Sequence, residues 1–161
     1  MDPENILKGR MGESLVEELL KKSGNKVYRF GYEAVLQNLT QLEESFNRES
    51  EVGQRIRSIP DFIVVNGKNI LLIEVKFRTD PIIYEKDIKK LNRIIEFWKA
   101  KIVLLTPQKP YFRVSNSPYL NEKGEWSWIA IEDDKDLKID KNTLNEFYKI
   151  IEKYFNKNSK N

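Results

Sequence analysis

The sequence predicts an α/β fold in which helices flank a central mixed β-sheet. Two β-rich runs, 61–65 and 68–76, are separated by Asn66-Gly67, the strongest short-range signal of a β-hairpin. Apolar residues at helical spacing over 84–98 and a continuous apolar run over 102–105 follow. A strand reached through a helical crossover lies parallel to an earlier strand, so both antiparallel and parallel pairs are expected.

Length and composition favour one domain over the whole chain. The 161 residues are 40% hydrophobic and 33% charged, enough for a packed core inside a charged surface. We expect a core at about 2–105, an elaboration at about 106–155 and a frayed tail at 156–161. The sequence contains neither the apolar run of a signal peptide nor a membrane span, so a soluble cytoplasmic protein without a membrane partner is expected.

The first element is predicted to be a helix. Asp2 serves as N-cap, Pro3 takes the first helical position and Glu4 lies in the first turn. The helix is expected to stop at Gly24. Glu13 falls at the edge of its apolar arc, close to the core but not inside it.

A short strand over 26–30 and a second helix over 35–46 are expected next, from alternation and then helical spacing. The polar stretch 48–58 contains Gly53 and is interpreted as a loop. Its arginines can bring positive charge to a ligand; they are Arg48, Arg55 and Arg57.

The remaining elements follow the hairpin. Asp80-Pro81 is interpreted as the start of the crossover helix. Three prolines break up the stretch 107–118, which is expected to be a long connection. A further strand is predicted over 126–131 and a C-terminal helix over 144–154.

Two residue types are absent, and this limits the chemistry. With no Cys the chain has no disulfide, thiolate metal site or thiol nucleophile, and with no His it has no imidazole base or ligand. Catalysis must use carboxylates, Lys, Tyr, Ser or Thr, around a hard cation such as Mg²⁺. The net charge of +3 does not by itself indicate a nucleic-acid-binding protein.

The predicted hairpin brings together a set of charged side chains. A two-residue loop at Asn66-Gly67 puts Asp61 opposite Leu72, with Glu74 and Lys76 on the same face. Asp61 and Glu74 are then diagonal neighbours roughly 7–8 Å apart, close enough to reach one cation. A four-residue loop would put Asp61 opposite Glu74 and keep the shared face, whereas a three-residue loop would separate them.

Two acids and a lysine on one face fit metal-assisted attack on a phosphodiester. The alternative is a solvated strand face with weak charge pairing. Glu74 interrupts the apolar run 70–73, and Asp61 follows Pro60 at the start of the partner strand. Charges inside apolar strands usually have a partner or an ion, which favours the site.

The motif resembles the signature of the PD-(D/E)XK nuclease superfamily. Pro60-Asp61 is followed, after twelve residues, by Glu74-Val75-Lys76. The resemblance implies a restriction-endonuclease-like core, in which a helix precedes a mixed sheet and a second helix. The segment from Lys8 to Glu13 further resembles the Lys-Gly-x-x-x-Glu opening of archaeal Holliday junction resolvases.

The resemblance also implies roles for individual residues. Asp61 and Glu74 would bind Mg²⁺ or Mn²⁺ with the carbonyl of Val75. Lys76 would position the attacking water or stabilise the transition state, and Glu13 would be a further acid near the metal. The implied function is a metal-dependent endodeoxyribonuclease, with DNA as partner and a homodimer as assembly. A resolvase of Holliday junctions or other branched DNA, and an inactive DNA-binding protein of nuclease descent, remain alternatives.

The chain departs from the resolvase pattern at several points. Ser14 stands where the resolvases commonly have Arg, no equivalent of a frequent glutamine is evident at 84–90, and the segment 34–58 is longer.

Basic side chains beside the site either line a phosphate track or are ordinary solvated charges. They are Lys8, Arg10, Arg55, Arg57, Arg78, Lys86 and Arg93. Tyr111, Phe112 and Trp126 can stack on unpaired bases but are more often core residues, and Glu132-Asp133-Asp134 is interpreted as an acidic turn.

Overall fold

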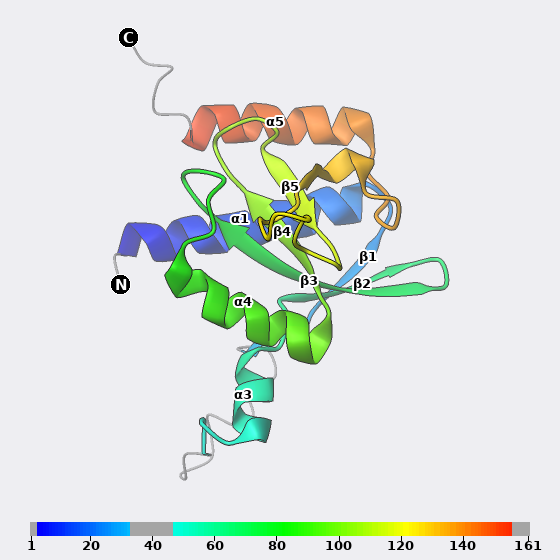
Figure 1. Cartoon of the computed structure of the whole chain (residues 1–161). Coiled ribbons are helices and arrows are strands. Elements are labelled where there is room, and N and C mark those ends of the chain that lie inside the picture. The colour runs from blue at the N-terminus through cyan, green and yellow to red at the C-terminus, as the bar shows by residue number, and fades with distance from the viewer. Residues whose placement is uncertain (1–2, 33–46, 156–161) are drawn as a thin grey trace.

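One six-stranded mixed sheet runs through the computed structural model of the chain, which describes residues 3–32 and 47–155 (Figure 1). The strands lie side by side in sequence order, and they are β1 Lys26–Arg29, β2 Phe62–Asn66, β3 Asn69–Phe77, β4 Lys101–Leu105, β5 Phe112–Ser115 and β6 Ile129–Ala130. β3 and β4 are parallel, and the other neighbouring pairs are antiparallel.

Helices cover both faces of this sheet. These are α1 Pro3–Lys22, α4 Glu85–Trp98 and α5 Lys141–Phe155, while the short helix α3 Glu51–Arg57 packs against α4. A 3₁₀ turn lies at Ile131–Asp133. α1 and α5 bury Val16, Leu20 and Phe147 against one face, together with strand residues such as Val103. α4 buries Leu91 and Ile94 against the other face, in a second apolar cluster with Ile102.

The fold class expected from the sequence is confirmed. α4 is the crossover that joins β3 to the parallel β4, and it has a strong apolar stripe with charges on its outer side. The C-terminal elaboration adds the strands β5 and β6 to the sheet and α5 to its outer layer. The expected helix over 35–46 and the tail 156–161 lie outside the described residues.

The hairpin turn lies one residue further along than predicted. Asn66 pairs with Asn69 and Val65 with Ile70, so Gly67 and Lys68 are the two loop residues. Gly67 has φ 61° and takes the first central position, where a type II′ turn requires positive φ. The shift changes each cross-strand partner by two residues and therefore keeps every side chain on its predicted face.

The loop predicted over 48–58 is wrong, because residues 51–57 form α3. The hydroxyl of Ser50 caps this helix by accepting a hydrogen bond from the amide of Gly53, at 3.0 Å. Position 53 requires glycine because the backbone of Asn47 and Arg48 passes close to its Cα atom. A Cβ atom at this position would lie 2.1 Å from the carbonyl oxygen of Asn47.

Three further expectations need correction. The crossover helix begins at Glu85. Asp80 does not cap this helix; its carboxylate accepts a hydrogen bond from the hydroxyl of Tyr84. The expected connection over 107–118 contains β5, whose Phe112 is fully buried, so it belongs to the core. The strand expected over 126–131 is limited to Ile129–Ala130.

Candidate active site

The hairpin brings the motif residues together at the start of β2 and the middle of β3. Phe62 pairs with Ile73, so continuing the register by one residue puts Asp61 opposite Glu74. This is the arrangement expected for a four-residue loop, and it brings the two carboxylates closer than the diagonal arrangement would. Glu74 and Lys76 share the face that α4 covers, because Ile73 and Val75 point into the core beneath α1.

Asp61 is held in place by the backbone of β3. Its Oδ2 accepts a hydrogen bond of 2.7 Å from the amide of Val75. Burial, reinforced by the neighbouring charges of Glu74 and Glu13, raises the pKa of Asp61 to about 7 against the opposing effect of Lys76. The carboxyl groups are therefore crowded, and the site gains stability from any added positive charge.

Glu74 is almost fully buried, with 2% of its surface exposed. The ammonium group of Lys76 pairs with Oε1 of Glu74 and also lies 3.4 Å from the carbonyl oxygen of Val75. Burial would lower the pKa of Lys76, but the charges of Glu74 and Asp61 outweigh it and raise that pKa. Lys76 is therefore a cation that contacts two of the predicted metal-binding groups.

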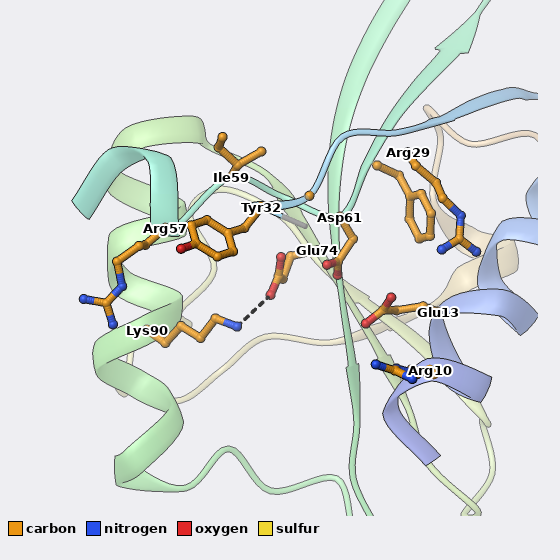
Figure 2. Close-up of a pocket in the computed structure, with 11 residues that line it drawn as sticks. Arg10, Glu13, Arg29, Tyr32, Arg57, Ile59, Asp61, Glu74 and Lys90 are labelled. Atoms are coloured by element: carbon orange, nitrogen blue, oxygen red, sulfur yellow. Dashed lines mark ion pairs between the residues drawn. The ribbon is translucent and has the colours of Figure 1, made fainter. Parts of the chain in front are cut away.

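Glu13 reaches the same place from α1, on the other side of the sheet. Gly12 allows this, since a Cβ at that position would lie 3.4 Å from Cβ of Phe77 at the end of β3. The helix can therefore pack closely against the strand, with the next residue, Glu13, at the site. Figure 2 shows Glu13 pointing toward Asp61, which agrees with the influence of Glu13 on the pKa of Asp61.

These acids line a pocket of about 300 Å³ (Figure 2). Its walls come from α1 and β1 on one side and from α3 and α4 on the other. The lining residues are Arg10, Glu13, Arg29, Gly31, Tyr32, Arg57, Ile59, Asp61, Phe62, Glu74 and Lys90. A polar cavity with convergent carboxylates and a ring of cations has the composition of a site for an anionic ligand.

Two of the predicted phosphate-contacting residues, Arg10 and Arg57, lie in this pocket. Lys8 pairs with Glu4 along α1, and Arg78 is held by Asp87 and the carbonyl of Phe77. The structure does not bring the others to the pocket; they are Arg55, whose guanidinium stacks on Phe97, Lys86 beside Tyr84, and Arg93.

Sequence reasoning missed six lining residues, of which Lys90, Arg29 and Tyr32 carry polar side chains. Lys90 lies 3.8 Å from Oε1 of Glu74 and precedes the buried Ile94 by four residues. A basic residue in line with the buried stripe of a helix was a usable signal. Arg29 ends β1 and Tyr32 lies three residues after it. Nothing local in the sequence distinguishes these two residues from other surface residues.

The donor atoms fit a hard divalent cation. Glu74 provides a buried carboxylate, the partly buried Asp61 lies opposite it, and Val75 provides a carbonyl. These are the oxygen ligands that Mg²⁺ prefers. Burial, and then the charge of Glu74, raise the pKa of Asp61, and a bound cation would lower it. Within 3–32 and 47–155, no group of three or more Asp, Glu, His or Cys side chains is arranged to hold a metal ion.

No family model and no curated protein matches the chain. Among solved structures, the chain is similar to Hjc of Archaeoglobus fulgidus, a Holliday junction resolvase from an archaeal hyperthermophile. The two share 19% identity, the match covers 84% of this chain and 97% of that one, and the TM-score is 0.43. At these values the similarity does not define an activity, which must be argued from the site itself.

A search of the described helices for membrane spans finds none long and apolar enough.

Proposed function

We propose that the protein is a metal-dependent endonuclease that hydrolyses phosphodiester bonds in DNA. The observation that carries the proposal is the meeting of Asp61 and Glu74 at one pocket lined with basic side chains, with Lys76 paired to Glu74 beside it. The Val75 amide holds Asp61 by a hydrogen bond, and Glu74 is buried. Deoxyribose as the sugar rests on the resemblance of the Pro60–Lys76 motif to nuclease sequences.

Asp61, Glu74 and the carbonyl of Val75 would hold the ion. A bound Mg²⁺ or Mn²⁺ lowers the pKa of a coordinated water and neutralises charge that develops on phosphate oxygens. The chain's own contribution is a fixed arrangement of ligands: the Val75 amide orients Asp61, and Lys76 orients Glu74. Preorganised charges of this kind lose little energy to reorganisation during a reaction.

Lys76 is the residue we expect to act on the water or the phosphate. Its ammonium sits between Glu74 and the carbonyl of Val75, so it lies beside the predicted ion. From there it can donate a hydrogen bond to the attacking water or to a phosphate oxygen. Glu13 adds a further carboxylate on the opposite side of Asp61, where it can accept a hydrogen bond from a water molecule.

Cutting both strands of a duplex requires two such sites, so we expect the active species to be a homodimer. Light scattering of the purified protein, with and without DNA, tests this point separately from activity.

The test of the function is cleavage of a DNA panel by the full chain. The panel contains a linear duplex, a supercoiled plasmid, a four-way junction and a single strand, each with Mg²⁺, Mn²⁺ or EDTA. We expect cleavage only with metal, and a loss of at least 100-fold in Asp61→Ala and in Glu74→Ala. DNA binding without cleavage by the wild type would overturn the nuclease and favour an inactive DNA-binding protein.

A further inference from the structure

One wall of the pocket consists of residues other than the predicted metal-binding groups, and it borders them at Glu74, 3.8 Å from Lys90. Arg57 at the end of α3, Lys90 on α4 and Tyr32 after β1 form this wall, with Ile59 beside them. In Figure 2 the ring of Tyr32 lies between the side chain of Arg57 and the carboxylate of Glu74, above Lys90. An aromatic ring with two cations therefore faces the carboxylates across the cavity.

Arg57 reaches this wall from α3, and contacts with α4 hold that helix in place. The indole of Trp98 donates a hydrogen bond of 3.3 Å to the carbonyl of Arg55, and the Arg55 guanidinium lies 5.2 Å from the ring centre of Phe97. Both contacts join α3 to the end of α4. Because the Ser50 cap fixes the other end of α3, Arg57 is presented to the pocket from a supported helix.

The cations of this wall are available to a ligand. Arg57 pairs with Glu49 at 2.9 Å, but the side chain of Glu49 is 74% exposed, and such pairs are weak. Lys90 is 3.8 Å from Glu74 and 60% exposed. On the opposite wall, Arg29 binds the nearly buried Glu17 at 2.6 Å, and Lys21 binds the same carboxylate. Arg57 and Lys90 can therefore reach a new anion at a lower cost than Arg29.

Tyr32 points to the class of ligand. The preceding aromatic residue, Phe30, packs edge-on against Trp98 with ring centres 5.6 Å apart, so it fixes β1 to α4. Tyr32 instead lines the cavity. A flat ring beside two cations offers a stacking surface for a base and contacts for its phosphate. A cavity of about 300 Å³ is at the small end of ligand pockets, which suits one nucleotide unit.

We propose that Tyr32, Arg57 and Lys90 form a subsite for one unpaired nucleotide next to the scissile phosphate, so that the preferred substrate is a strand without a partner at that point. A base inside a duplex has both faces covered by its neighbours, whereas an unpaired base can leave the stack and pack on a tyrosine ring. This inference rests on the proposed nuclease function for the position of the scissile phosphate.

The test compares three fluorescent DNAs with the same sequence at the labelled position: a blunt duplex, a single strand and a duplex with splayed single-stranded ends. Binding is measured by anisotropy in EDTA at low salt, and cleavage with Mg²⁺ is measured separately. The full chain is used as wild type, Tyr32→Leu and Tyr32→Phe, with Tyr28→Leu as control. Tyr28 lies on β1, four residues before Tyr32, is 54% exposed and is not a lining residue.

We expect the wild type to bind the single strand and the splayed DNA at least tenfold more tightly than the blunt duplex. Tyr32→Leu should weaken binding to these two DNAs by about 5-fold to 150-fold, the range of base–aromatic stacking, and leave the blunt duplex within twofold. Tyr32→Phe should keep the preference, because it keeps the ring. Arg57→Gln should weaken single-strand binding. It should also lower by about one the slope of the logarithm of the binding constant against the logarithm of salt concentration. Arg48→Gln is the control.

Circular dichroism checks that each variant is folded. If Tyr32→Leu does not fold, Arg57→Gln tests the subsite in its place. An unchanged ratio of single-strand to duplex affinity in both pocket variants overturns the subsite, even if cleavage is normal. A preference for unpaired DNA in EDTA that Tyr32→Leu removes supports the subsite, even if no cleavage occurs with any metal, in which case only the nuclease proposal fails.

Discussion

The carboxylate of Asp61 and the backbone amide of Val75 are joined by a hydrogen bond of 2.7 Å. Asp61 lies just before β2, so this contact ties the entry to β2 to the middle of β3 and turns the side chain toward Glu74. The result is a pair of facing carboxylates held close together before any cation arrives. Such an arrangement favours metal binding and costs stability in the free protein.

Asp61→Asn should therefore stabilise the metal-free protein while it removes activity. We expect the free energy of unfolding in EDTA at pH 8 to rise by about 1 kcal/mol, and the stabilisation by Mg²⁺ to disappear. The folded-state pKa of about 7 lies above the ordinary 3.8, so the wild type loses stability as pH rises between these values. The difference between variant and wild type should grow over this range in urea titrations.

Asp133→Asn, on the exposed 3₁₀ turn, is the matched control and should show no such pH trend. A lower stability of Asp61→Asn in EDTA would contradict the view that the carboxylates repel one another.

Glu13→Gln should reduce the cleavage rate by about 10-fold to 100-fold, the range observed for groups that support metal ligands. The substitution keeps the size of the side chain and removes its charge from the neighbourhood of Asp61. Single-turnover rates at saturating DNA, together with Mg²⁺ titrations, provide the measurement. Glu18→Gln, exposed on the same helix, should behave as the wild type; equal losses in both variants would point to an effect on α1 as a whole.

Periodicity alone was enough to predict the main layers of the fold. The N-terminal helix, the crossover helix and the buried strand after it occur as expected, since each depends on a long apolar pattern. α3 was missed because it has only seven residues and contains Gly53, whose reason for being there is a contact with Asn47. β5 was missed because the prolines flanking it indicated a loop, although they leave the strand itself free.

The candidate site was predictable to the extent that it depends on local geometry. Strand parity placed Asp61, Glu74 and Lys76 on one face, and a two-residue error in the pairing did not alter it. Lys90 and Tyr32 reach the same pocket through the packing of α4 and the path after β1. For Lys90 the helical stripe gave a usable signal, whereas the placement of Tyr32 depends on tertiary contacts that no local pattern encodes.

Acid should destabilise the protein partly through a cluster of charged residues, none of which lines the pocket. Lys101 on β4 is 2.9 Å from Asp134 and 2.7 Å from Asp136. Burial alone would raise the pKa of Asp134, but hydrogen bonds from Lys101, Asn116 and the Leu137 amide outweigh it and lower that pKa below 3.8. A carboxyl with a lowered pKa contributes stability above its ordinary pKa, and this is lost as pH falls through the lowered value.

Asp134→Asn should therefore flatten the fall in unfolding free energy below about pH 4, and should cost roughly 2 kcal/mol at pH 7 because Lys101 stays buried with fewer partners. Urea titrations between pH 2 and pH 7 provide the measurement. If the unfolding free energy of the variant falls with decreasing pH as steeply as that of the wild type, the loss of stability in acid belongs to other carboxylates.

Two helical glycines should respond in opposite directions to the same substitution. Gly53→Ala should destabilise the protein by about 2 kcal/mol, because the new Cβ would lie 2.1 Å from the carbonyl oxygen of Asn47 and 2.9 Å from the backbone of Arg48. Gly9→Ala, on α1, meets nothing within 4 Å and should stabilise by about 0.5–1 kcal/mol, since alanine favours the helix. Thermal and urea unfolding of both variants in EDTA measures the two effects. A gain in both would show that α3 can shift away from Asn47, and the support that α3 gives Arg57 would then be weaker than its packing against α4 indicates.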